Sequence, residues 1–148
     1  MADTKVQQEA ARWLRENWLP AKYGQQFSAQ AVRLSPGGSF HFDGVSQDKS
    51  IVVTISTSAA QTASGKPGSG KLQKIRADVL FLLLSEARRP VLVFTEPGMF
   101  RWCQEEKENG RLPSSLEVLL AELPSELQVR LADARRKASV EVSPRTSP

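Results

Sequence analysis

The feature that most constrains this chain is the stretch 40–58, which reads FHFDGVSQDKSIVVTISTS. Its first residues alternate between apolar and polar, as they do in a strand with one buried face. A polar turn, SQDK, follows, and the run Ile51–Ile55 then consists of β-branched residues, which are typical of a buried strand. The stretch therefore predicts a β-hairpin that carries an acid, Asp43, near its middle.

Length and composition limit the remaining choices. A chain of 148 residues, 40% hydrophobic and 24% charged, is large enough for one domain with its own core. The net charge of +4 permits contact with a polyanion such as nucleic acid but does not require it. The single cysteine, Cys103, excludes an internal disulfide and a cysteine-rich zinc site, and the single histidine, His41, excludes a multi-histidine metal site.

The domain and its location follow from similar arguments. We expect a single domain over residues 1–137 and a polar, disordered tail over 138–148. The N-terminal segment is amphipathic and unlike a signal peptide, and no apolar run is long enough to span a bilayer. We therefore expect a cytoplasmic protein without membrane contact.

Hydrophobic periodicity predicts helices and strands along the rest of the chain. Helices are expected over 4–19, where Pro20 would end the first one, and over 71–88, 99–109 and from 125 onward. Strands are expected over 27–34 and 91–95, the second being a short apolar run after a helix. By period alone, the segment 116–123 fits either a helix or a last strand. The order strand, helix, strand predicts an α/β fold.

The hairpin resembles the PD-(D/E)xK nuclease superfamily, whose mark is a strand ending in Asp, a short turn, and a hydrophobic strand that carries an acid-x-Lys triplet. The resemblance implies a restriction-endonuclease-like fold, in which helices flank a central mixed β-sheet and a strand occupies 116–123. Asp43 falls at the first metal-binding acid. The triplet falls on residues 54–56, where Thr54 holds the acid position and Ser56 the lysine position. The resemblance therefore implies a conserved scaffold with a degraded catalytic motif.

The same resemblance suggests further site residues. In active members, acidic side chains hold magnesium ions that activate water. The resemblance implies Glu9, on the first helix, as a further metal ligand, and we consider His41 as a helper. Related nucleases relocate catalytic residues to the neighbouring helix, where Lys71 and Lys74 are candidates for the missing lysine. Mg²⁺ is thus the implied cofactor, although Asp43 is the sole acid in the expected strand positions.

Strand alternation predicts how the polar residues of the hairpin are arranged. His41, Asp43 and Val45 are expected on one face of their strand, and Thr54 and Ser56 on one face of the next. If the two faces coincide, the polar residues form one cluster, which requires hydrogen bonds or a metal when buried. The alternative is that Asp43 and the glycine after it only shape the end of a strand.

Two interpretations concern phosphate groups. Four basic residues would serve as phosphate contacts of a nucleic-acid-binding surface: Lys66, Lys71, Lys74 and Arg76. The run Gly65–Lys71 also matches the GxxxxGK pattern of a phosphate-binding loop. However, Leu72 stands where such loops place a magnesium-binding Ser or Thr, and the preceding strand ends far upstream. A flexible glycine-rich linker is the better interpretation of this run.

The sequence supports three functional hypotheses. The first is a restriction-endonuclease-like domain that has lost most of its catalytic site and has nucleic acid, DNA foremost, or a protein as its partner. The second is an active Mg²⁺-dependent nuclease, which hydrolyses phosphodiesters with Asp43, Glu9 and either Lys71 or Lys74. The third is a nucleotide-binding protein that uses Gly65–Lys71. Nucleases of this kind often act as dimers, so a homodimer is among the forms that the resemblance implies.

Overall fold

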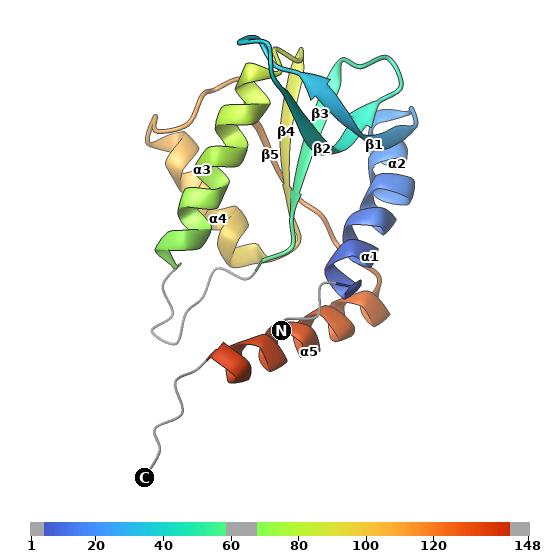
Figure 1. Ribbon diagram of the computed structural model, residues 1–148. Coiled ribbons are helices and arrows are strands. Elements are labelled where there is room, and N and C mark those ends of the chain that lie inside the picture. The colour runs from blue at the N-terminus through green and yellow to red at the C-terminus, as the bar shows by residue number, and fades with distance from the viewer. Residues whose placement is uncertain (1–4, 59–67, 143–148) are drawn as a thin grey trace.

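The computed structural model describes residues 5–58 and 68–142, with side chains up to residue 137. A five-stranded sheet forms its centre, in the order β1-β2-β3-β4-β5 (Figure 1). The strands are β1 (Phe27–Arg33), β2 (Ser39–Ser46), β3 (Ile51–Ser56), β4 (Arg89–Phe94) and β5 (Glu117–Leu120). The helices are α1 (Lys5–Trp13), α2 (Leu19–Tyr23), α3 (Ser69–Leu84), α4 (Pro97–Glu108) and α5 (Ser125–Val142), and a π-helical segment (Leu14–Trp18) joins α1 to α2.

The sheet is mixed, and its two kinds of pairing follow from its connections. The strands β1, β2 and β3 pair antiparallel, because short turns join them. The strands β3, β4 and β5 pair parallel, because α3 and α4 provide the crossover connections. In Figure 1, α3 and α4 cover one face of the sheet, while α1 and α2 lie on the other side. This architecture confirms the predicted α/β class with helices flanking a central mixed sheet.

Each face of the sheet has its own hydrophobic core. One core joins β2, β3 and β4 to α3 and α4, and includes Phe42, Val52, Leu82 and Met99. The other joins the sheet to α1, α2 and α5, and includes Leu14, Val53 and Leu131. Because β3 and β4 are covered on both faces, they are buried along nearly their whole length, as their apolar sequences predicted.

The predicted strands are confirmed, including the one that periodicity left open. The hairpin forms as β2 and β3, and 27–34 contains β1. The segment 116–123 contains β5, which pairs parallel with β4. The helix α5 continues past residue 137 to Val142, into the stretch predicted to be a tail, and 143–148 lie outside the described residues. None of the helices in the described residues is long and apolar enough to cross a bilayer.

Two predicted helix ends were wrong. Pro20 does not end the first helical region, because a π-helical segment precedes it and the backbone stays helical through the start of α2, where Pro20 lies in the first turn. The region ends instead at Gly24, whose φ of 72° suits a glycine. The helix α3 ends at Leu84, because the Ser85 hydroxyl donates to the Leu82 carbonyl at 2.6 Å and Glu86 takes a φ of 57°.

The predicted face shared by His41, Asp43 and Val45 was also wrong. Between the pairs Ser28↔Val45 and Gln30↔Phe42, β1 advances from 28 to 30 while β2 advances from 42 to 45, so β2 contains a bulge. Because of this extra residue, Phe42 and Val45 both enter the core beneath α3. Asp43 lies within the bulge and is therefore released from strict alternation.

Candidate functional site

The carboxylate of Asp43 lies where β2 and β3 separate. The two strands pair at Gly44↔Val53 and Val45↔Val52. Beyond these pairs, the Ile55 amide donates to Asp43 Oδ2 at 2.7 Å. A side-chain oxygen of β2 therefore takes the place of a backbone carbonyl as the acceptor. The Arg15 guanidinium also donates to the Asp43 carbonyl at 3.1 Å. Both contacts fix the half-buried Asp43 at the C-terminal end of β3.

A pocket of about 320 Å³ opens beside this carboxylate and is called here the Asp43 pocket. It brings together three of the residues that the sequence nominated: Asp43 from β2, Ser56 from β3 and Lys74 from α3. Gln7 and Gln8 of α1 form part of its wall. Because it lies at the C-terminal end of a parallel strand, the pocket occupies the edge at which open α/β sheets bind ligands.

A second carboxylate, Asp78, comes from α3. It is buried, and Lys74 Nζ lies 3.4 Å from its Oδ2. Burial raises the pKa of Asp78 above its ordinary value, the Lys74 ammonium opposes that rise, and the negative charge of Asp43 adds to it. Asp78 was not among the site residues predicted from the sequence. Its signal was an acid within the apolar stripe of α3 that contains Ile75 and Leu82.

Thr54 and Ser56, the two neutral residues predicted as site residues on β3, are both buried. Thr54 and Ser56 are 5% and 6% exposed, and alternation places both on the face of β3 that α3 covers. Ser56 lines the Asp43 pocket. Thr54 Oγ1 is buried without a hydrogen-bond partner in the described part of the chain. An unsatisfied buried hydroxyl of this kind lowers stability.

Glu9 and His41, the other two residues predicted as metal ligands, do not line the Asp43 pocket. The Glu9 carboxylate binds Arg130 of α5 through two hydrogen bonds, of 2.7 and 2.9 Å. His41 is exposed on β2, opposite Ala31 of β1. Within residues 5–58 and 68–137, no group of three or more His, Cys, Asp or Glu side chains is arranged to hold a metal ion.

The basic residues predicted as phosphate contacts do not form one group in the described part of the chain. Lys71 lies exposed near the start of α3, and Lys74 follows one turn later beside the Asp43 pocket. Arg76 points instead towards α4, where it binds Glu106 at 3.3 Å and lies over the Trp102 ring. Lys66 and the first part of the predicted phosphate-binding loop, 65–67, lie outside the described residues. The nucleotide-binding hypothesis for that loop therefore remains a prediction.

One further arginine reaches the same edge of the sheet. Arg135 of α5 donates to the Thr57 carbonyl at 3.2 Å and to Thr95 Oγ1 at 3.4 Å. Burial lowers its pKa, and the negative charge of Glu96 opposes this effect. Since Thr57 lines the Asp43 pocket, Arg135 holds α5 against the pocket wall.

Cys103, the only thiol, takes no part in this site. It lies on α4 and is fully buried in the core that α3 and α4 form with the sheet. Burial and, to a smaller extent, the charge of Glu106 raise the pKa of Cys103 to about 12. The thiol is therefore protonated at neutral pH, which excludes a role as a thiolate nucleophile.

Comparison with known proteins identifies no relative. No protein-family model matches this chain, and no curated protein or solved structure gives a significant match. The functional argument therefore rests on the chain's own residues.

The orphaned hydroxyl of Thr54 gives a stability prediction. Thr54→Val keeps the shape of the side chain and removes a buried polar atom that has no partner among the described residues. We expect the free energy of unfolding in urea to rise by about 1 kcal/mol. Thr95→Val is the matched control, because the Thr95 hydroxyl accepts a bond from Arg135 and its loss should not stabilise the protein. An unchanged or lower stability for Thr54→Val would show that the hydroxyl is satisfied in solution.

The raised pKa of Asp78 gives a pH prediction. Between its ordinary pKa of about 4 and the raised value, the folded protein binds more protons than the unfolded chain, so stability falls as pH rises through this range. Asp78→Asn removes the ionisable group and, with it, this loss of stability at higher pH. Thermal unfolding should therefore show Asp78→Asn more stable than wild type at pH 7, with a smaller difference at pH 4. A difference independent of pH would contradict the assignment.

Proposed function

We propose that this chain is a restriction-endonuclease-like domain that associates with nucleic acid, DNA foremost, and retains little or no catalytic activity. The observation that carries the proposal is the Asp43 pocket. Asp43, Ser56 and Lys74 line this pocket together, and the resemblance aligns Asp43 with the first metal-binding acid and Ser56 with the lysine of the motif. The five-stranded mixed sheet with helices on both sides supports the same fold assignment.

The contacts within the pocket explain why activity would be weak. Asp43 uses one carboxylate oxygen to accept from the Ile55 amide, which leaves fewer lone pairs for a metal. Thr54 and Ser56 are neutral, so they supply neither the second charge of a metal site nor the cation that assists the attacking water. Lys74, in turn, lies within ion-pair distance of Asp78.

The exposure of Lys74 supports a binding role. Its side chain is 69% exposed, although its amine lies near Asp78. An exposed lysine at the rim of a pocket can reach a phosphate group of a bound nucleic acid while its stem stays on the helix. Phosphate contacts of this kind position a protein on nucleic acid without reading its sequence.

A second candidate function, an active Mg²⁺-dependent nuclease, is favoured by Asp78. The charge of Asp43 acts on Asp78, so two carboxylates and Lys74 lie in one region. Mg²⁺ is commonly bound through one or two carboxylates with water in its other positions, and Asp43 and Asp78 fit that requirement. They would hold the ion, which supplies charge stabilisation and an acidified water. In this version Asp78 replaces Glu9, whose carboxylate binds Arg130.

Binding and cleavage measurements test the proposal together. Labelled duplex DNA, single-stranded DNA and RNA are incubated with the wild type, Asp43→Asn and Lys74→Gln, with Mg²⁺ or Mn²⁺. We expect salt-dependent binding without cleavage. Lys74→Gln should weaken binding equally for all sequences and lower the salt slope by about one. Asp43→Asn keeps an acceptor for the Ile55 amide, so the fold should persist and binding should not weaken.

Lys107→Gln on α4 removes the same charge away from the Asp43 pocket and serves as the matched control. Metal-dependent cleavage that Asp43→Asn and Asp78→Asn both abolish would establish the second candidate instead. Absence of binding to every nucleic acid at low salt would overturn the nucleic-acid role and leave a protein partner as the remaining hypothesis.

A further inference from the structure

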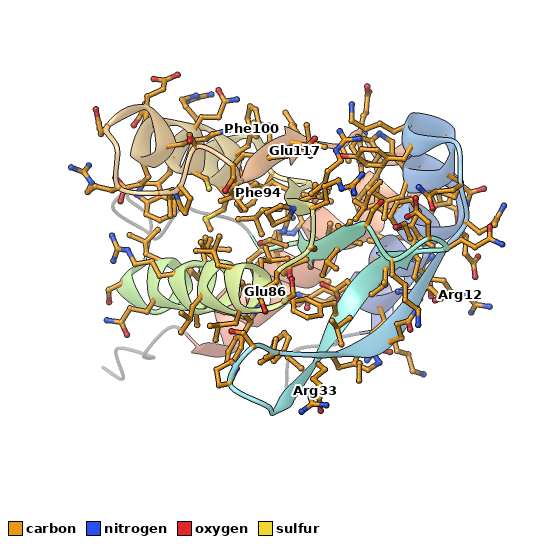
Figure 2. All side chains as sticks on the ribbon, turned by 90° about the horizontal axis from the view of Figure 1, so that it is seen from above. Arg12, Arg33, Glu86, Phe94, Phe100 and Glu117 are labelled. Carbon is orange, nitrogen blue, oxygen red and sulfur yellow. The ribbon has the colours of Figure 1, made fainter. Side chains whose placement is uncertain are left out.

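A second pocket of about 320 Å³ lies at the opposite end of β3 from the Asp43 pocket. Its walls come from the end of β1, the turn between β2 and β3, and the segment that joins α3 to β4. Figure 2 looks down on this end of the molecule, with Glu86 beside the end of α3 and Arg33 on the β1–β2 hairpin. Four charged residues line it, and we call it the cationic pocket: Arg33, Lys49, Glu86 and Arg88.

The three cations of this pocket form no ion pair with another described residue. Arg33, Lys49 and Arg88 take part in none of the salt bridges found among the described residues. The acid beside Lys49 in sequence, Asp48, is engaged within its own turn, where Oδ1 accepts from the Ser46 and Ser50 hydroxyls. Three positively charged residues therefore line one hollow, with a single acid, Glu86, among them.

Backbone conformation sets this pocket apart from the rest of the described chain. Lys49 has a φ of 64° and Glu86 a φ of 57°, and they are the only described residues other than glycine with a positive φ. Lys49 lies in the turn between β2 and β3, Glu86 follows the end of α3, and both take a conformation that glycine adopts at lower cost. Both also line the cationic pocket. Residues held in a disfavoured conformation cluster at ligand sites, so this coincidence points to binding.

The mixture of charges indicates the class of ligand. Three cations around a small hollow suit a phosphate group, to which Arg and Lys donate charge-assisted hydrogen bonds. A carboxylate among them would repel a bare anion or an acidic peptide, but it accepts hydrogen bonds from a hydroxyl or amino group. A nucleotide has both parts, and the volume lies at the lower end of the range for small-molecule sites.

We propose that the cationic pocket binds a nucleotide. The phosphate contacts Arg33, Lys49 and Arg88, and a sugar hydroxyl or base amino group donates to Glu86. The same chemistry occurs in a free nucleotide and at the phosphorylated end of a nucleic-acid strand. The site does not involve Asp43, Lys74 or Asp78, so it is independent of the function proposed for the Asp43 pocket.

Calorimetric titration with AMP, inorganic phosphate and a 5′-phosphorylated oligonucleotide tests this site. Two glycine substitutions separate a binding role from a purely structural one. Lys49→Gly and Glu86→Gly should each raise the melting temperature by about 3 °C, because glycine relieves the positive φ. Lys49→Gly should weaken binding of AMP and of phosphate by about tenfold. Glu86→Gly should weaken AMP binding but not phosphate binding.

Arg101→Gln on α4, outside the cationic pocket, is the control for loss of one positive charge and should change neither property. If Lys49→Gly fails to fold, Arg33→Gln at the end of β1 provides the same test of the phosphate contact. Tighter binding of the oligonucleotide than of AMP would assign a strand end as the ligand, and equal binding would assign a free nucleotide. The proposal is overturned if AMP does not bind, if AMP binds no tighter than phosphate, or if both glycine variants bind AMP like wild type.

Discussion

The hydrogen bond from the Ile55 amide to the Asp43 carboxylate connects β2 and β3 at the point where their backbone pairing ends. The bulge in β2 frees Asp43 from strict alternation, and the bridging bond then gives its side chain a fixed place between two strands. A buried backbone amide needs an acceptor, so this carboxylate supports the fold as well as any chemistry at the site. The pocket walls from β3 and α3 are arranged around it.

This double use of one carboxylate explains the character of the site. Asp43 Oδ2 accepts the Ile55 amide and so supports the fold, while the same residue lines the pocket. The neighbouring helix adds Lys74 and Asp78, whose positions one turn apart bring them together beside the same strand end. The result is a polar pocket whose charged ligand contacts would come from α3 more than from the neutral Thr54 and Ser56 on β3.

Much of the fold was predictable because it follows local patterns. The β-branched run of β3, the alternation in β2 and the apolar face of α3 each specify their element. The bulge in β2 was not predictable, since it depends on register against β1 and reverses the face of Val45. The prediction that Pro20 ends the first helix was wrong for a related reason, because the energetic cost of a proline depends on its position within a helix.

The site was predictable only in part. Asp43, Ser56 and Lys74 could be nominated from the resemblance, and the structure brings them to one pocket. The role of Asp78 and the position of Glu9 away from the pocket depend on how α3 and α5 pack, which the sequence does not specify.

The most direct test of nucleic-acid binding at the Asp43 pocket is a nitrogen-15 NMR titration of the labelled protein with a short DNA duplex. We predict that the Ile55, Ser56 and Lys74 amide signals shift at low salt and return as salt is added, with Lys107 unaffected. Shifts confined to other parts of the chain would contradict it.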